Sequence, residues 1–294
     1  MQLDRPAQGH VAMLAFSALV AGSFSLGAMA ARHVDPGVLS ALRFALAAVI
    51  LGVVARASGG AVAAPMRAAP WRWLLLGGLM AAYFVLMFEG LKTASAVSTA
   101  AVFTLTPLMA AGFGWLFLRQ ITTPRMALAL ALGAAGALWV IFDADLGALM
   151  RLEVGRGEAV YFWGCAAHAA YAALVRRLNR GESPIVSTFL TMSAGAVLLA
   201  LWSAPAMAAT DWATLPGIVW VTLAYVSVAA TATTSYLVQF ASMRLPAAKV
   251  MAYTYLVPSW VILWELALHG GLPPALVGVG VAMTCLALLL LLRD

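Results

Sequence analysis

A patterned face of hydroxyl and aromatic side chains lies within an apolar stretch of the sequence. Ser95, Thr99, Phe103 and Thr106 follow one another at helical spacing, so they share one side of a helix. Hydroxyl groups beside an aromatic ring can hold a neutral ligand that has a polar end and an apolar body. Hydroxyls in such helices also bond to the carbonyl of their own preceding turn, so each one alone is weak evidence.

Three other apolar stretches carry the same combination of groups. Ser235 and Gln239 lie four residues apart, and Tyr83 and Tyr253 add phenol groups elsewhere. Further hydroxyls stand beside them at Thr231, Thr234, Thr254 and Tyr255. The concentration of neutral hydrogen-bonding groups on four stretches predicts one shared binding cavity.

His168 lies midway along an apolar stretch, with Trp163 and Tyr171 near it on the expected helix. An imidazole titrates near neutral pH, so His168 is either a packed core side chain or a group that lines a cavity. The sequence leaves both interpretations open. The complete set of residues predicted to bind substrate is Tyr83, Thr99, Phe103, Trp163, His168, Tyr171, Ser235, Gln239 and Tyr253.

The other ionisable side chains within apolar stretches favour structural roles. Arg43 lies about two turns into its stretch, where it can extend to the surface or bond to loop carbonyls. Glu89 and Lys92 are three residues apart, which predicts a local ion pair. Because no Lys or Arg is expected at mid-depth on a cavity-lining helix, an anionic substrate would bury an unpaired charge. We therefore expect a net-neutral substrate.

The sequence contains no pattern that supports catalysis or cofactor binding. The motif Gly-x-x-x-x-Gly-Lys of ATP-binding loops is absent, and no mid-depth carboxylate is available to carry a proton. The histidines and cysteines lie on separate elements without metal-ligand spacing: His10, His33, His168, His269, Cys165 and Cys285. We expect no cofactor, no metal, no enzymatic activity, and transport by facilitated diffusion or with only weak ion coupling.

These residues must be positioned by membrane-spanning helices. The chain is 64% hydrophobic and 10% charged, against roughly 45–50% and about 25% in soluble domains. Ten apolar stretches approach the roughly 20 residues that cross a bilayer: 11–31, 38–55, 71–91, 94–118, 126–142, 160–175, 185–202, 218–240, 250–268 and 275–292. We expect one all-α integral membrane domain over residues 1–294.

The ten stretches divide into two sets of five, in repeat halves 10–145 and 155–293. Because five is odd, the second half begins on the opposite side of the bilayer from the first, which predicts an inverted repeat. The halves align on Pro107 and Pro258. A proline inside a span frees a backbone carbonyl, so this pair marks either two plain kinks or a binding site between the halves.

The charge distribution predicts the orientation. With a cytoplasmic N-terminus, most Lys and Arg residues fall on the inner side, among them Arg56, Arg119, Arg176 and Lys249, as the positive-inside rule requires. Both termini are then cytoplasmic, in the inner (plasma) membrane. The net charge of +6 follows from this bias and does not indicate nucleic acid. The first stretch is longer than a signal-peptide core, so we expect it to stay in the protein.

A family resemblance rests on the second stretch and on residues 92–136. Pro36 followed by the run Ala41-Leu42-Arg43-Phe44-Ala45-Leu46-Ala47-Ala48 resembles the second-helix signature of the EamA type of the drug/metabolite transporter superfamily. Residues 92–136 are similar to its fourth and fifth helices. The chain departs from the family at Leu118-Arg119-Gln120, where members often carry Gly-Glu. The aromatic-rich spans look closest to the aromatic amino acid exporters called YddG.

The resemblance implies ten helices around a central cavity lined by spans 1, 3, 4, 6, 8 and 9. It also implies export of a small molecule by alternating access. Combined with the neutral, aromatic residues above, it predicts a monomeric exporter of neutral hydrophobic or aromatic amino acids in the lipid bilayer. The alternatives are an exporter of other neutral metabolites or drugs, such as nucleobases or threonine- and homoserine-like molecules, or a membrane enzyme or receptor.

Overall fold

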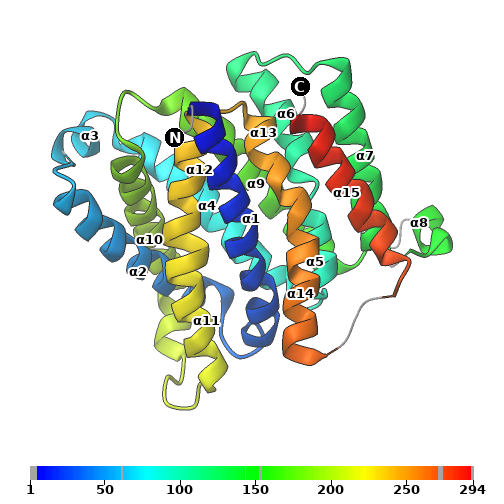
Figure 1. The fold of residues 1–294 in the computed structure, drawn as a ribbon. Coiled ribbons are helices and arrows are strands. Elements are labelled where there is room, and N and C mark those ends of the chain that lie inside the picture. Colours follow the sequence, from blue (N-terminus) through cyan, green and yellow to red (C-terminus); the bar gives the residue numbers. More distant parts are fainter. Residues whose placement is uncertain (1–4, 61, 143, 152–153, 271–273, 293–294) are drawn as a thin grey trace.

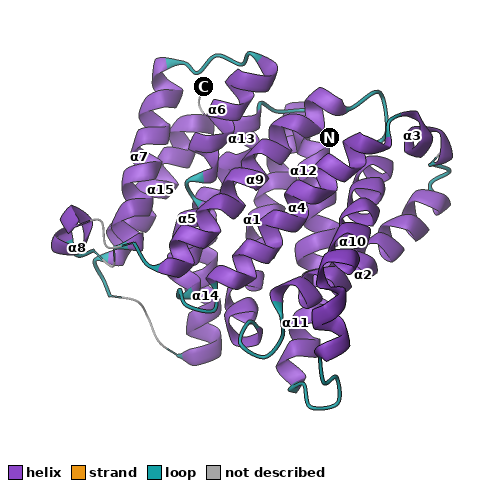
Figure 2. Cartoon of the chain, turned by 180° about the vertical axis from the view of Figure 1, so that it is seen from behind, coloured by secondary structure: helices purple, strands orange, loops and turns teal. Residues whose placement is uncertain are grey.

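The computed structural model describes residues 5–60, 62–142, 144–151, 154–270 and 274–292. Every regular element in these ranges is a helix. Long helices run side by side, with α1, α5, α9, α12 and α14 in the middle (Figure 1). The view from behind shows the same order, with α2, α3 and α10 on one flank and α7 and α15 on the other (Figure 2). The N- and C-terminal ends lie at the same end of the bundle (Figure 1).

The first half of the chain forms α1 (Arg5–Ala30), α2 (Pro36–Ala57), α3 (Ala63–Ala68), α4 (Pro70–Gly90), α5 (Ala96–Phe103), α6 (Thr106–Leu118), α7 (Pro124–Ile141) and α8 (Leu146–Arg151). The second half forms α9 (Arg156–Leu178), α10 (Pro184–Ala209), α11 (Gly217–Ser227), the π-helix η1 (Val228–Thr233), α12 (Thr234–Ser242), α13 (Ala247–Ala252), the 3₁₀ segment η2 (Tyr253–Leu256), α14 (Val257–His269) and α15 (Val277–Leu292).

Prolines and capping side chains set the helix starts. Pro36 and Pro184 each occupy the first position of a helix, where the missing N–H costs nothing and φ is already helical. The Asp35 carboxylate accepts the backbone N–H groups of Gly37 and Val38, and the Thr123 hydroxyl accepts that of Met126. Such side-chain caps satisfy donors that the first turn leaves free.

Eight helical segments of the described chain are long and apolar enough to cross a membrane. Three of them are composite, because α5 with α6 forms one segment, α11 with η1 and α12 another, and α13 with η2 and α14 a third. Helix α9 has 23 residues and carries Arg156, Glu158, Arg176 and Arg177 near its ends. Helix α15 is apolar throughout and has 16 residues. The expected multi-helix membrane protein is therefore confirmed at this level.

Glycine pairs let helices of the two halves approach closely. A Cβ on Gly77 of α4 would lie 2.6 Å from the backbone nitrogen of Gly195 on α10. A Cβ on Gly136 of α7 would lie 2.7 Å from the carbonyl oxygen of Gly280 on α15. Both distances are too short for any side chain, so these positions admit only glycine without movement of a helix. Small residues at such crossings are the usual means of packing helices in membranes.

Candidate functional site

Six rings from four helices pack together in the middle of the bundle. We call Phe16 and Phe24 of α1, Tyr83 of α4, Phe103 of α5, and Tyr161 and His168 of α9 the ring cluster. All six side chains are at most 2% exposed. The His168 ring lies edge-on to Tyr83 at 4.3 Å between centroids and to Phe103 at 5.5 Å. Such edge-to-face geometry is favourable for aromatic groups.

Polar atoms in the ring cluster and on the neighbouring helix α12 have no hydrogen-bond partner. Both ring nitrogens of His168 are buried and unpaired, and so is the hydroxyl of Ser235 on α12. One turn further along α12, the Gln239 side-chain nitrogen donates to the Tyr171 hydroxyl at 3.0 Å. Buried polar groups almost always have partners. The unpaired groups here are therefore candidates to bind a molecule that brings its own donors and acceptors.

The structure brings together most of the residues that the sequence singled out. Tyr83, Phe103 and His168 belong to the ring cluster, and Tyr171 and Gln239 are bonded to each other beside it. The burial of His168 within the ring cluster fits the interpretation as a packed core side chain. A contact of His168 with a substrate stays a prediction.

Two predicted residues make hydrogen bonds within the protein instead of facing an open site, Thr99 to its own preceding turn and Tyr253 to a distant helix. The Thr99 hydroxyl donates to the Ser95 carbonyl at 2.7 Å, which is the local bonding that the sequence had left open. The Tyr253 hydroxyl lies 3.1 Å from Nδ1 of His10 on α1. Both side chains are buried, so a ligand would reach them only after these contacts change.

The expected proximity of Trp163 to His168 is wrong. Trp163 is 68% exposed on the outside of the bundle, where it packs edge-on to Phe162. It precedes His168 by five residues, which places it about 140° away around an α-helix. A side chain there lies on the outer surface of the bundle, and Trp163 is not part of the interior.

Both proline-containing helices are broken at matching points. Helix α5 ends at Phe103 and α6 begins at Thr106, directly before Pro107. In the second half α13 ends at Ala252, and α14 begins at Val257, directly before Pro258. Both pairs of starts, Ala96 with Ala247 and Thr106 with Val257, have the same sequence offset as the two prolines. The breaks therefore lie beside Phe103 in one half and at Tyr253 and Thr254 in the other.

Arg43 is the buried residue whose role the sequence analysis missed. It is fully buried on α2, so the expectation that it extends to the surface is wrong. Its Nε donates to the Thr231 hydroxyl at 2.8 Å, and its Nη2 donates to the Ala230 carbonyl at 3.3 Å. The guanidinium carbon lies 3.7 Å from the centroid of the Phe84 ring. A charged side chain therefore lies in the interior, on a helix outside the set that was expected to line the cavity.

The partner of Arg43 is the π-helix η1, an irregular turn that the sequence did not signal. The Thr233 hydroxyl donates to the carbonyl of Val228, five residues earlier. The Ala230 carbonyl accepts from both Arg43 and the Thr234 hydroxyl. A π-turn widens the helix and leaves carbonyls to be satisfied by side chains, and such turns are frequent at functional sites.

A second buried arginine joins the two halves near the start of α4. The Arg72 guanidinium donates to the Leu178 carbonyl at 2.7 Å and to the Glu182 carboxylate at 2.8 Å. The two side chains are 1% and 5% exposed. Burial alone would raise the pKa of Glu182, but hydrogen bonds from Arg72 and from the Arg180 backbone N–H lower that pKa overall. The pair fixes α4 to the loop between α9 and α10.

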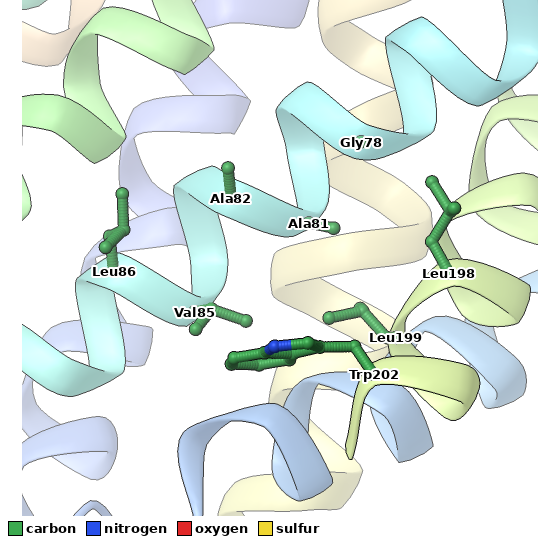
Figure 3. A pocket seen from close by; sticks show the side chains of 8 residues that line it. All are labelled: Gly78, Ala81, Ala82, Val85, Leu86, Leu198, Leu199 and Trp202. Atoms are coloured by element: carbon green, nitrogen blue, oxygen red, sulfur yellow. The ribbon is translucent and has the colours of Figure 1, made fainter. Parts of the chain in front are cut away.

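A groove on the outside of the bundle differs in kind from this interior. It has a volume of about 320 Å³ and lies between α4 and α10. Trp202 and Val85 line it, with Leu198 and Leu199 on the α10 side (Figure 3). Its walls are almost entirely apolar and Trp202 is 64% exposed. A groove of this chemistry suits lipid chains, because it offers no polar side chain to orient a small polar substrate.

A bundle of apolar helices with a buried aromatic and polar centre defines the class of multi-pass membrane transporters. The family model described as "EamA-like transporter family" matches this chain twice, over residues 7–142 and 155–293. The chain belongs to the EamA-like transporter family. The EamA part of the family expectation is thus confirmed.

Two known proteins resemble the chain over most of its length. An uncharacterized transporter of Bacillus subtilis (strain 168), YyaM, is 26% identical over 219 residues, which cover 74% of this chain and 72% of that protein. A solved structure, titled only as the crystal structure of a protein, has a TM-score of 0.72 at 19% identity. It covers 98% of this chain and 96% of that one, and it shows that the fold is shared.

Proposed function

We propose that this transporter exports small neutral amino acids with aromatic or other apolar side chains. The observation that carries the proposal is the ring cluster together with the unpaired polar atoms of His168 and Ser235 beside it. Aromatic rings offer an apolar surface to a substrate side chain, and the unpaired groups offer hydrogen bonds to its polar end. The family supports transport, and the chemistry of the centre supports the substrate.

The proposed architecture is a ten-helix inverted repeat in which α9 and α15 also cross the membrane. Three observations support it. The proline breaks match, the family model matches each half separately, and counterpart helices pack in pairs, α2 with α10 and α7 with α15. Termini at one end of the bundle require an even number of crossings (Figure 1). The Lys and Arg distribution favours a cytoplasmic location for that end.

Export in this proposal proceeds by alternating access, and the protein acts as a monomer in the inner membrane. The ring cluster is closed to both ends, since its members are at most 2% exposed. Substrate therefore enters only when helices of one half move relative to the other. Among the described residues, the nearly buried Glu182 carboxylate pairs with Arg72 at the loop between α9 and α10, and the ring cluster itself contains no Asp or Glu. We accordingly propose flux that follows the substrate gradient without an obligatory proton.

The first test replaces His168 with leucine and measures uptake of labelled tryptophan into proteoliposomes. His168→Leu keeps the approximate volume and removes two nitrogens that have no partner in the folded protein. We expect transport to fall about tenfold, the value of one lost hydrogen bond to the substrate, with thermal stability in detergent maintained. Unchanged tryptophan transport would contradict a substrate contact at His168.

The matched control is Trp163→Leu on the same helix. Trp163 lies on the outer face of α9 at 68% exposure, so its loss is expected to leave transport near the wild-type rate. Equal losses in the two variants would assign the effect to the packing of α9 as a whole. Failure of the wild-type protein to move any aromatic amino acid would refute the proposed substrate.

A further inference from the structure

Arg43 presents a buried positive charge whose assigned partners are all neutral. In the described residues its contacts are the Thr231 hydroxyl, the Ala230 carbonyl and the rings of Phe84 and Phe88. An arginine side chain stays protonated in proteins. Burying it without an anion is costly, and contacts with aromatic faces offset only part of that cost. Binding of an anion would therefore neutralise the buried positive charge of Arg43.

One nitrogen of the guanidinium remains available. Nη1 of Arg43 is buried and has no hydrogen-bond partner, whereas Nε and Nη2 are both engaged. Because two nitrogens are fixed by η1 and by the Thr231 side chain, the third has a defined orientation before any ligand binds. Guanidinium N–H groups held in this way are suited to bind a carboxylate.

The available nitrogen belongs to the same interior as the ring cluster. The Phe84 ring, which faces the Arg43 guanidinium, lies 4.5 Å from the Tyr83 ring between centroids. The Tyr83 ring in turn lies 4.3 Å from the His168 ring between centroids. Thr231 precedes the unpaired Ser235 by four residues. The charge and the unpaired polar groups thus flank the same set of rings.

We propose that Nη1 of Arg43 binds the carboxylate of the transported molecule, while the ring cluster receives its apolar side chain. This inference rests on the proposed function and specifies which group forms the polar end of the substrate. The substrate carries a carboxylate and an apolar body, and the amino group is of secondary importance. Nucleobases and aromatic amines, which have no carboxylate, are excluded. A residue of α2, which the family resemblance treats as scaffold, therefore takes part in selectivity.

The wild-type protein alone can test this inference. Uptake of labelled L-tryptophan into proteoliposomes is measured against unlabelled L-tryptophan, indole-3-propionate, tryptamine and L-tryptophan amide. Indole-3-propionate keeps the carboxylate and should compete within a few-fold of tryptophan. Tryptamine and the amide lack it and should compete at least about tenfold more weakly, as expected for a lost bond to a charged group. Competition by tryptamine equal to that by tryptophan would overturn the inference.

Variants of α2 give a second readout. Arg43→Gln keeps a hydrogen-bonding side chain near Thr231 and removes the charge, so the preference for indole-3-propionate over tryptamine should collapse to about unity. Arg56→Gln, at the exposed far end of the same helix, should keep that preference. A preference retained in Arg43→Gln would overturn the inference. If wild-type protein takes up tryptophan and tryptamine alike, the proposed function stands and the role of Arg43 fails.

Discussion

The two broken helices of the molecule are interrupted at equivalent backbone positions and differ in the side chains that they carry there. At the offset that aligns Pro107 with Pro258, Phe103 corresponds to Thr254, and both are fully buried. Phe103 packs its ring among the five others of the ring cluster, whereas the Thr254 hydroxyl has no hydrogen-bond partner. The same backbone position therefore supplies an apolar wall in one half and a polar group in the other.

This difference shows how two similar halves can recognise an asymmetric molecule. A duplicated backbone fixes where the helices break, and the breaks keep side chains of both halves near the centre. Substitution at the equivalent positions then decides which end of a substrate each half contacts. A ring opposite a hydroxyl suits a molecule with an apolar side chain and a polar end.

The largest expected effect comes from forcing apart the counterpart helices α7 and α15. Gly136→Leu places side-chain atoms against the Gly280 carbonyl, which lies 2.7 Å from the Cβ position. We expect the free energy of unfolding to fall by about 3 kcal/mol, the upper range for overpacking, as measured by denaturant unfolding in detergent. Gly278→Leu is the control because nothing lies near its Cβ. Equal stabilities would show that the pairing of α7 with α15 is loose.

An intermediate effect is expected where Arg72 and Glu182 join the halves. Glu182→Gln removes the charge and one partner of Arg72, so stability at pH 7 should fall by about 1 kcal/mol. The pKa of Glu182 is lowered in the folded protein, so its contribution is present above the ordinary carboxyl pKa and is lost as the pH falls through the lowered one. The wild-type and variant unfolding temperatures should therefore converge in acid.

Glu89→Gln provides the matched control for that measurement. Glu89 pairs with Lys92 at 2.6 Å, and their side chains are 38% and 34% exposed, respectively. The sequence-based expectation of this local pair is confirmed. Exposed pairs contribute little, so this variant should keep wild-type stability and transport. A stability gap for Glu182→Gln that persists undiminished in acid would rule out the charged pair as its cause.

The smallest expected effect sharpens the comparison between Phe103 and Thr254. Thr254→Val keeps the shape and removes a hydroxyl that has no partner, so thermal stability should be equal or slightly higher. Tryptophan transport should fall about threefold if the hydroxyl bonds to substrate. Thr188→Val is the control, since its hydroxyl bonds to the Pro184 carbonyl and transport should not change. Unchanged transport in both variants would make Thr254 a packing residue.

The positions of the helices could be predicted from the sequence, because the length of an apolar stretch and the presence of a proline are local signals. Pro36 and Pro184 begin helices, and the breaks fall directly before Pro107 and Pro258. Each of these signals acts on its own backbone segment, so neighbouring helices do not alter it.

The orientation of side chains around the helices was harder to predict from the sequence. In a membrane the outer face of a helix is as apolar as the inner face, so hydrophobic periodicity distinguishes them poorly. Trp163 and His168 lie on one apolar stretch and face opposite environments. The partners of Arg43 on η1 are more than 180 residues away in sequence, and no local pattern specifies such a contact. Phe16, Phe24 and Tyr161 were missed for the same reason.

The π-helix η1 makes the centre sensitive to chain length as well as to residue type. A π-turn accommodates one more residue than an α-turn would over the same length. Deleting a single residue from Val228–Thr233 would therefore restore regular α-helix while the residues after it, Ser235 and Gln239 among them, keep their direction. The Ala230 carbonyl would then lie within a regular α-helical turn, and Arg43 would lose an acceptor that η1 supplies. Gain or loss of one codon at η1 is thus a route by which the contacts of Arg43 change although every neighbouring side chain keeps its identity.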